Sequence, residues 1–542
     1  MQEEKRRNRL LRRVDWRFLL PCPSPVTSIC FAGGRIAKAV ERISERLADP
    51  RRGVQEECDL AVAINPHQST LVEAWDALRP GGCCYVEWYS PFAGGTAGIR
   101  RRMEAVGFES VTCYWPWPSP GLACAHLWLP LEAPGALHHL LIRGPAARGA
   151  FRQVARGIRR TVWLLALRAG LALPICVIAR KRADSANEPP SPCETTGSAR
   201  CRTRLAACMS ADLIRTLQAE WSTWGLGPTP RQLSWLLLTG GFRSSNKIVA
   251  LLFAEPDPRP QLVVKLPRVP ESISTLANEA TILRALHSLR PGGIVGTPRL
   301  LFWRDHGGVM TLGETAVTGA ALLTQLRRAT YRSLALQATS WQAALAGRPV
   351  LSPRAVWWNR LVEPVLTEVQ DSYGGVLDAG KLAETRAILA SVDSLPLVCE
   401  QRDFSPWNVV ITASGALGVL DWESAEIQGL PALDLIYFLT YLAFFLDGAI
   451  SSGRFQQSYR ASLDPLTLTG RVRVECLASY AEHIGLPPAA LYPLRLLVWL
   501  LHARSEYSRF VADAGGTPTS ETLRRGLFIS LWEEELRRGG NG

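Results

Sequence analysis

A stretch without hydrophobic periodicity divides the chain into two parts. Residues 183–202 read ADSANEPPSPCETTGSARCR and are rich in Pro, Ser, Thr and Glu. Such a composition offers no apolar face to a core, so it predicts a linker. The chain of 542 residues is also longer than one hydrophobic core usually serves. We therefore expect a domain at 1–182, a linker at 183–205 and a second domain at 206–542.

The composition is that of a globular protein with a basic surplus. Hydrophobic residues make up 47% and charged residues 20%, while the formal net charge is +13. A surplus of this size permits contact with anionic partners but identifies none, and no nucleic acid partner is expected. The basic residues are concentrated in one place, because residues 143–182 contain ten of them and no acidic residue. This segment predicts a peripheral contact with anionic membranes, or else a solvated basic face.

An apolar segment inside this basic region has about the length of a membrane span. Residues 161–179 read TVWLLALRAGLALPICVIA, but Arg168 lies near the centre and Pro174 follows. A buried helix followed by the strand PICVIA is therefore expected. The beginning of the chain, MQEEKRRNRLLRR, lacks the apolar core of a secretory signal, and the 13 cysteines form no CxxC pair. These features predict reduced thiols in a cytoplasmic protein.

Strand and helix patterns alternate in the first domain. The apolar run VTSICFA is followed by the helical pattern RIAKAVERISERLA, the strand pattern DLAVAINP by STLVEAWDALRP, and a glycine pair leads into CCYVEWY. This rhythm predicts an α/β domain with a parallel sheet and crossover helices.

The second domain changes character along its length. KIVALLFAE and QLVVKLPR predict two paired strands, and NEATILRALHSL predicts an amphipathic helix. From about residue 322 onward, long helical patterns dominate. We expect a small strand-rich lobe at about 206–321 and a helical lobe at about 322–542.

A group of polar residues in the helical part has the spacing that phosphoryl transfer requires. Residues 401–408 read QRDFSPWN and precede the strand VVI, and the strand GVL ends in Asp421-Trp422-Glu423. Four residues separate Asp403 from Asn408, as in the catalytic loop of kinases. Phosphoryl transfer needs a carboxylate near the acceptor hydroxyl and oxygen ligands for magnesium. A short hairpin would return Asp421 to the side of Asn408.

These motifs resemble those of the aminoglycoside phosphotransferase and choline kinase family. Its pattern is His-Gly-Asp, four residues, Asn, and then a strand ending in Ile-Asp-Trp-Glu. The resemblance implies a protein-kinase-like bilobal fold and ATP- and Mg²⁺-dependent transfer to a hydroxyl of a small molecule. It implies that Asp403 is catalytic and that Asn408, Asp421 and Glu423 hold the metal. The chain departs from the pattern at Gln401 and Arg402, which replace His and Gly.

The resemblance extends to three further places. Asp434, in GLPALDLIYFL, matches the acid that opens the family's next helix and is expected to hold the catalytic loop. Lys265 on a strand is expected to hold the phosphates of ATP, and Glu279 on the following helix is expected to belong to the nucleotide site as the partner of this lysine. The loop TGGFRSSN is expected to cover those phosphates through Gly240, Gly241, Ser244 and Ser245.

The acceptor is left open by the sequence. Residues 424–542 carry 12 acidic residues and 11 Arg, so they show no acidic excess for a polycationic acceptor. Trp357, Trp358 and Tyr507 could stack on a ligand, although aromatic residues in helices more often belong to the core. The alternative to an enzyme is a catalytically weak binding or scaffold protein of the same fold.

The first domain resembles a truncated class I S-adenosylmethionine-dependent methyltransferase. The likeness rests on CDLAVAINP, a helix, and then ALRPGGCCYVEW. The loop that would bind the cofactor matches the family pattern poorly, because the first strand ends in Cys-Phe-Ala-Gly-Gly at residues 30–34. We also expect a helix to use most of the residues between Gly34 and Asp59 and to leave no room for an acid-bearing second strand. We expect a degenerate, Rossmann-like domain for which S-adenosylmethionine is an unlikely cofactor, with a bifunctional methyltransferase–kinase as the alternative.

Overall fold

The computed structural model divides into two compact units. It describes residues 10–20, 25–50, 57–89, 94–117, 119, 125–143, 174–182, 211–240, 247–290, 292–306, 308–514 and 516–539. The N-terminal unit consists of Gln2–Leu276 and Leu300–Ala316, and the C-terminal unit of Ala277–Arg299 and Val317–Gly542. The expected linker at 183–205 lies outside the described residues, and the contacts group strands from both sides of it into the N-terminal unit.

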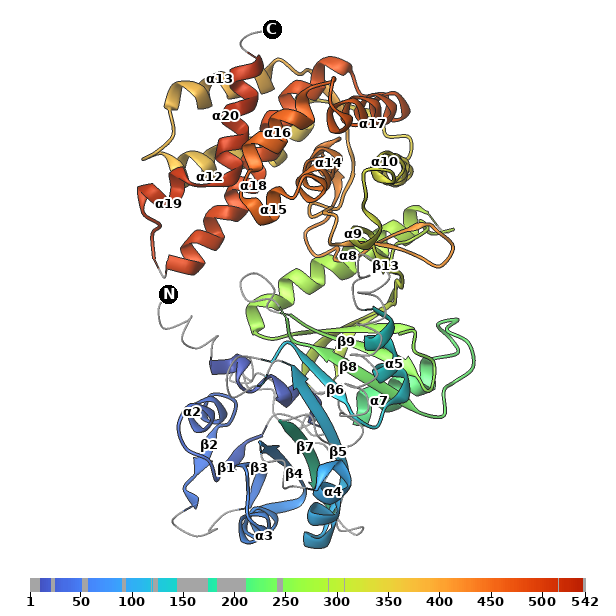
Figure 1. Ribbon diagram of the computed structural model, residues 1–542, viewed down its shortest axis with the longest axis vertical. Helices are drawn as coiled ribbons and strands as arrows, with labels where there is room; N and C mark the ends of the chain where they lie inside the picture. Colours follow the sequence, from blue (N-terminus) through green and yellow to red (C-terminus); the bar gives the residue numbers. More distant parts are fainter. Residues whose placement is uncertain are drawn as a thin grey trace. The chain divides into compact units, whose positions relative to one another are not determined.

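The N-terminal unit is built on one twelve-stranded sheet (Figure 1). The strand order is β11-β12-β10-β9-β8-β6-β5-β7-β4-β3-β1-β2. Strands β2, β1, β3 and β4 are parallel, and the pairs from β4 through β7, β5, β6, β8, β9, β10 and β12 to β11 are antiparallel. The strands are β1 Thr27–Cys30, β2 Arg46–Ala48, β3 Cys58–Ile64, β4 Leu78–Trp88, β5 Phe108–Trp117, β6 Leu127–Pro130, β7 Ile175–Lys181, β8 Leu233–Leu238, β9 Lys247–Ala254, β10 Leu262–Pro267, β11 Leu300–His306 and β12 Val309–Thr315.

One sequence expectation about this sheet is wrong. Between Gly34 and Asp59 the chain does form a second strand, because β2 pairs in parallel with β1, with Thr27 opposite Arg46. The helix that was expected to fill this stretch, α2, covers only Arg35–Glu41. Seven residues of helix leave room for a strand of three residues, and Asp49 follows directly after it.

The pairing of β6 with β8 joins the N-terminal strands to the strands expected in the small lobe. Leu127 lies opposite Leu238, and Trp128 opposite Leu237. Each face of the sheet then carries one apolar core that runs across this junction. Leu60 and Tyr85 share one core with Leu237 and Ile248. The other core likewise joins residues of β3 and β4 to residues of β8 and β9.

Helices cover both faces of this sheet. Ile36 and Val40 of α2 and Leu213 and Leu217 of α7 lie in one core. Helices α3, α4 and α5 contribute to the other. The bounds are η1 Asp15–Leu19, α2 Arg35–Glu41, α3 Gln68–Ala77, α4 Gly95–Val106, α5 Pro134–Arg143, α7 Ala211–Glu220, η5 Pro270–Ser272 and α8 Ile273–Leu289, whose residues from Ala277 onward belong to the C-terminal unit.

The C-terminal unit is mainly helical, as the periodicity predicts, and its short strands lie between Ala320 and Gly429 (Figure 1). Its three small sheets pair β13 with β17 and β18, β14 with β15, and β16 with β19. The elements are β13 Ala320–Ala321, α9 Leu322–Gln325, α10 Tyr331–Ala346, β14 Leu351–Pro353, α11 Arg354–Trp357, η6 Trp358–Val362, α12 Glu363–Tyr373, α13 Ala379–Ala390, β15 Ser394–Pro396, β16 Val398–Glu400, β17 Val409–Ile411, β18 Leu417–Val419, β19 Glu426–Gly429, α14 Leu433–Leu446, α15 Ala449–Ser452, α16 Phe455–Leu463, α17 Leu468–Ile484, η7 Pro488–Ala490, α18 Leu491–Ala514, α19 Ser520–Arg524 and α20 Leu527–Gly539.

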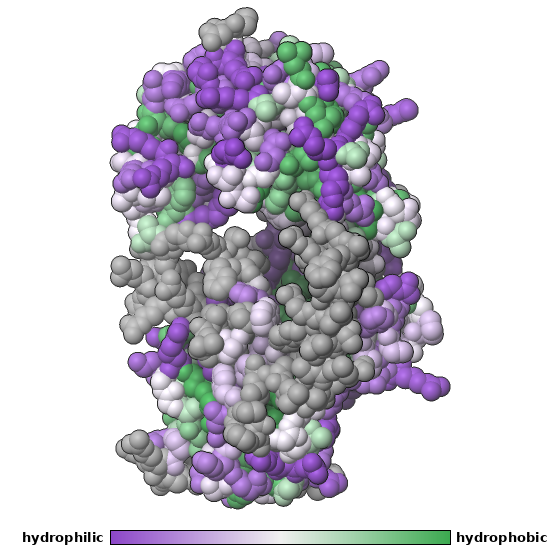
Figure 2. Space-filling model, viewed as in Figure 1, coloured by the Kyte–Doolittle hydropathy of each residue, from purple (hydrophilic) through white to green (hydrophobic). Residues whose placement is uncertain are grey.

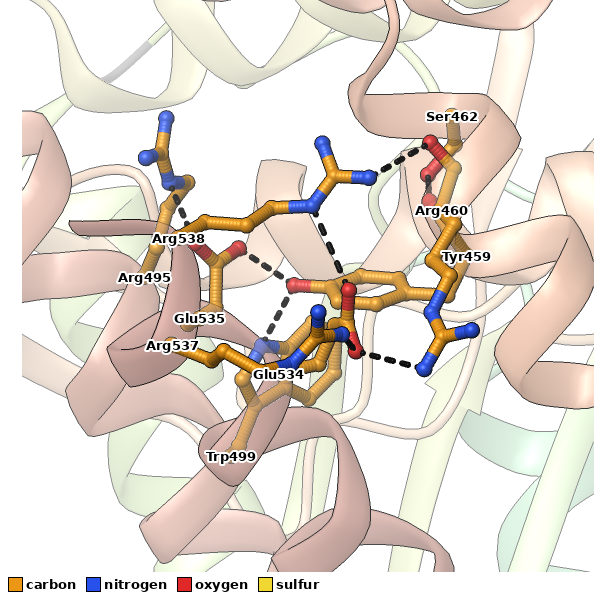
Figure 3. A network of polar contacts seen from close by, with 9 residues as sticks. All are labelled: Tyr459, Arg460, Ser462, Arg495, Trp499, Glu534, Glu535, Arg537 and Arg538. Atoms are coloured by element: carbon orange, nitrogen blue, oxygen red, sulfur yellow. Dashed lines mark hydrogen bonds and ion pairs between the residues drawn. The ribbon is translucent and has the colours of Figure 1, made fainter. Parts of the chain in front are cut away.

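A buried polar network connects α16, α18 and α20 (Figure 3). The hydroxyl of Tyr459 donates to the carboxylate of Glu535 and accepts a hydrogen bond of 2.8 Å from Nε1 of Trp499. Arg495 donates to the same carboxylate over 3.2 Å. Glu535 is fully buried, so these hydrogen bonds offset the cost of removing its carboxylate from water.

In Figure 2, the surface over α12, α13 and α20 of the C-terminal unit is largely hydrophilic. Exposed ion pairs such as Lys381–Glu533 and Arg386–Glu363 contribute to this surface. Of the apolar segment 161–179, the described part includes β7, which agrees with the expected strand PICVIA, whereas 161–173 lies outside the described residues. Within the part of the chain that the structure describes, no helix is long and apolar enough to cross a membrane.

Candidate active site

The loop at 401–408 is fixed at its beginning by a buried carboxylate. Asp434, in the first turn of α14, accepts hydrogen bonds from the backbone N–H groups of Gln401 and Arg402, at 2.6 and 2.9 Å. The expectation that this acid holds the loop is therefore confirmed. The ring of Phe404 is fully buried, between Trp341 at 5.5 Å and Phe438 at 4.8 Å.

Gln401 connects this loop to the segment that carries Asp421. Its side-chain oxygen accepts from the backbone N–H of Asp403 at 2.8 Å, and its amide nitrogen donates to the carbonyl oxygens of Leu420 and Asp421. A glutamine can make these bonds on both sides at once because it has a donor and an acceptor. The replacement of the family's histidine thus leaves the two segments tied together.

Asp403 and Asn408 are in direct contact. The amide nitrogen of Asn408 donates to the backbone oxygen of Asp403 at 3.0 Å and to its carboxylate at 2.7 Å. Both side chains remain partly exposed, although Ser405 between them is buried. The amide oxygen of Asn408 is the atom left for a metal ion, because the nitrogen is engaged with Asp403.

Helix α8 holds the Asp421–Glu423 segment from the other side. Glu279 is fully buried and accepts a hydrogen bond of 3.0 Å from the backbone N–H of Trp422. Asn278 donates to the carbonyl oxygens of Glu423 and Ala425, at 2.9 and 3.3 Å. Sequence reasoning expected Glu279 to pair with a lysine and missed this contact with the backbone, since residue type alone does not report it.

Backbone strain is concentrated around these segments. Arg402, Asp421 and Ala432 have positive φ values of 65°, 66° and 66°, in the left-handed region that glycine prefers. Each costs about 1–2 kcal/mol, which the surrounding hydrogen bonds must offset. Such outliers are typical of functional sites.

A second buried carboxylate accompanies Arg402. Glu400 is almost fully buried and accepts a hydrogen bond of 3.2 Å from Nε of Arg402. Burial raises the pKa of Glu400, and burial together with the nearby charge of Glu400 raises the pKa of Asp434. Arg402 is a cation close to both carboxylates, so it favours their charged forms.

In the N-terminal unit, Lys265 lies buried on β10. Its ammonium group forms an ion pair of 2.8 Å with Glu314 on β12, a partner that sequence reasoning did not name. Lys265 and Glu279 belong to different units, and their pairing stays a prediction. Of the expected phosphate-covering residues, Gly240 is described, and open space surrounds the position where a Cβ would lie. Gly241, Ser244 and Ser245 lie outside the described residues.

The aromatic residues around the loop differ from those singled out in the sequence. Trp357 is buried, Trp358 donates to Glu363, and Tyr507 packs on Tyr373. Trp407, inside the loop, has 43% of its surface exposed. Its ring lies 5.0 Å from that of Tyr441.

The donor atoms at the loop suit magnesium. Asn408, Asp421 and Glu423 offer oxygen ligands, and Mg²⁺ is a hard cation that prefers oxygen. Within the described ranges no group of three or more His, Cys, Asp or Glu side chains is arranged to hold a metal ion. The three residues expected to hold the metal include only two carboxylates. Mg²⁺ is usually bound by one or two carboxylates together with substrate phosphates.

One family model matches part of the chain. Residues 243–468 match the family model described as "Phosphotransferase enzyme family". This range includes the loop at 401–408, Lys265, Glu279 and Asp421. A search of curated proteins found no significant match to the chain.

Solved structures that are similar to part of the chain include small-molecule kinases. An aminoglycoside phosphotransferase from Streptomyces rimosus is 14% identical, with 52% of this chain and 97% of that chain covered and a TM-score of 0.30. A choline kinase from Streptococcus pneumoniae is 10% identical, with 60% and 98% covered and a TM-score of 0.35. An ethanolamine kinase from Plasmodium vivax is 11% identical, with 56% and 81% covered and a TM-score of 0.34. Scores this low carry no argument about the acceptor.

Proposed function

We propose that the protein is an ATP- and Mg²⁺-dependent phosphotransferase that acts on a hydroxyl group of a small molecule. The observation that supports this most directly is the contact between Asn408 and the carboxylate of Asp403, at 2.7 Å, within a domain that matches the phosphotransferase family. The contact orients a partly exposed carboxylate at the loop, where an acceptor hydroxyl needs it.

The roles of the other residues follow from their chemistry. Asp403 orients the acceptor hydroxyl and takes its proton as the phosphoryl group is transferred. Asn408, Asp421 and Glu423 hold Mg²⁺, which neutralises charge on the phosphate oxygens when it is bound. Lys265 contacts the phosphates of ATP, and the loop with Gly240, Gly241, Ser244 and Ser245 covers them.

The acceptor site includes the exposed face of Trp407. Trp407 follows Asp403 by four residues and directly precedes Asn408, and its ring packs on that of Tyr441 on α14. Tyr441 packs in turn on the buried Tyr437, with ring centres 4.7 Å apart, so Trp407 rests on a fixed aromatic base. A flat aromatic surface suits an acceptor with an apolar face, such as a sugar ring or an amino alcohol.

The test is an ADP-release screen with purified protein, ATP and Mg²⁺ over sugars, amino alcohols and aminoglycosides. At least one acceptor class should raise ADP release above the rate without acceptor, and chelation of Mg²⁺ should abolish the increase. A variant without the exposed ring, Trp407→Ala, should raise KM for that acceptor more than it lowers kcat.

A binding or scaffold protein is the second candidate, and the replacement of His and Gly by Gln401 and Arg402 favours it. Such a protein would bind ATP with Mg²⁺, which calorimetry would detect, but no acceptor would raise ADP release. That result across the panel would contradict the enzymatic proposal.

A further inference from the structure

The N-terminal segment, residues 10–20, is packed into the core of the N-terminal unit. Nearly every residue of the segment is buried. Trp16 stacks on Tyr85 of β4 with ring centres 3.9 Å apart, and Arg13 forms two hydrogen bonds with the fully buried Glu87, at 2.5 and 2.7 Å. The segment therefore belongs to the folded core and is not a free terminus.

The same segment reaches the end of β10. Asp15 accepts a hydrogen bond of 3.3 Å from Nε of Arg268 and forms an ion pair with its Nη2 at 3.3 Å. Arg17 donates to the backbone oxygen of Arg268 at 3.1 Å. All three side chains are at most 1% exposed. Charges buried this deeply depend on one another, because water does not reach them.

Arg268 also contacts Thr239, the residue that follows β8. Its Nη2 donates to the backbone oxygen of Thr239 at 2.7 Å. Thr239 is also held by the two residues before β6, since its hydroxyl donates to the backbone oxygen of Ala125 and its N–H to that of His126. Thr239 is the residue directly before Gly240, where the phosphate-covering loop begins.

Arg268 thus connects the segment to both places that the nucleotide would use. It follows Lys265 by three residues, just beyond the end of β10, and its side chain holds the residue that opens the glycine loop. The single side chain of Arg268 thus contacts both the carboxylate of Asp15 and the backbone oxygen of Thr239.

We infer that the N-terminal segment positions the nucleotide-binding elements, with Asp15 and Arg17 as positioning residues that act through Arg268. This inference rests on the proposed function, since it assumes that Lys265 and the glycine loop bind ATP. The N-terminal region then supports phosphoryl transfer, because residues 10–20 set the geometry of β10 and of the chain at Thr239.

The experiment compares two buried ion pairs of the same segment in the full-length protein. Asp15→Asn removes the charge that faces Arg268, whereas Glu87→Gln removes the charge that faces Arg13 and does not touch Arg268. Both variants should lower the melting temperature. Only Asp15→Asn should raise the dissociation constant for ATP in calorimetry, by about 3- to 30-fold. It should also speed hydrogen exchange at 235–239 and 262–268 by about tenfold or more, while Glu87→Gln leaves those segments unchanged.

Two outcomes separate this inference from the proposed function. Equal exchange at 235–239 and 262–268 in the two variants would overturn the inference, and this measurement needs no nucleotide. Failure of the wild-type protein to bind ATP would instead overturn the proposed function, and with it the nucleotide role given to the segment. If Asp15→Asn does not fold, Arg268→Lys keeps the charge but loses the forked hydrogen bonds to Asp15 and Thr239, and the same exchange comparison decides.

Discussion

Arg402 combines a backbone that suits glycine with a side chain that glycine cannot supply. Its φ of 65° places it in the left-handed region, at the position where the resembled family carries glycine. Its guanidinium meets Glu400, which is 2% exposed and would otherwise be a buried charge with few partners. The ion pair of Arg402 with Glu400, the residue directly before the loop, therefore offsets the backbone strain at Arg402.

This coupling predicts that Arg402→Gly destabilises the protein even though it relieves the backbone. The gain of about 1–2 kcal/mol from the freed φ is smaller than the cost of removing the cationic partner of a buried carboxylate, which is about 3–5 kcal/mol. Chemical denaturation should show a net loss for Arg402→Gly. The double variant Arg402→Gly with Glu400→Gln should recover most of it, because the buried charge is gone. Equal stability of the single and double variants would argue against the coupling.

Asp403 carries the prediction about chemistry. Asp403→Asn should lower turnover by orders of magnitude and leave ATP affinity nearly unchanged, since the base acts mainly at the transition state. Steady-state ADP release and calorimetry would measure the two quantities. Asp371→Asn, an exposed aspartate on α12, is the matched control and should behave like the wild type. Full activity of Asp403→Asn would remove this residue from its role.

At the scale of elements, helix α8 makes a contact that bears on the expected pair of Lys265 and Glu279. Glu279 accepts from the backbone of Trp422, and Lys265 is paired with Glu314. Loss of Glu279 should therefore disturb the Asp421 segment, in addition to any effect on Lys265.

The prediction for these residues is a double-mutant cycle on KM for ATP. Lys265→Ala should raise KM, and Glu279→Ala should raise it less. If the two residues form one ion pair, the double variant should be less than additive. Fully additive losses would count against the pair and would assign Glu279 to the support of Trp422.

The network of α16, α18 and α20 gives a prediction about stability. Glu535→Ala leaves Arg495 and the hydroxyl of Tyr459 without a buried carboxylate and should cost about 3–5 kcal/mol. Glu533→Ala, two residues earlier on the same helix, removes only an exposed pair with Lys381 and should cost at most about 1 kcal/mol. Denaturant titration of both variants would compare them, and similar losses would contradict the role of burial.

Local patterns predicted most individual strands but not how the strands join. The runs that contain β1, β3, β4, β7, β9 and β10 were readable because their apolar residues are contiguous or alternate. The pairing of β6 with β8 was not readable, because only two residue pairs define it and about a hundred residues separate the strands. The contact of Asp15 with Arg268 was hidden for the same reason, whereas the Asp403–Asn408 spacing was local and could be recognised.

For the whole molecule, we predict that the N-terminal region does not bind S-adenosylmethionine usefully. Asp49 after β2 does supply an acid, but the loop at 30–34 remains a poor approach for a cofactor. Trp16 and Arg13 also cover Tyr85 and Glu87 near the carboxyl end of β4. Calorimetric titration should show no micromolar binding, with ATP in the same preparation as the positive control. Micromolar binding would revive a bifunctional methyltransferase–kinase.

The continuous sheet has a consequence for solubility. Two separate sheets would have four edge strands, each with unpaired backbone groups that can recruit another chain. Joining β6 to β8 leaves two, β2 and β11. Strand β2 has only three residues and begins with an arginine, while β11 has an irregular register after Leu300 and carries the charged residues Arg304 and Asp305. Short, charged and irregular edges resist strand addition, so the junction that extends the sheet also protects it from edge-to-edge aggregation.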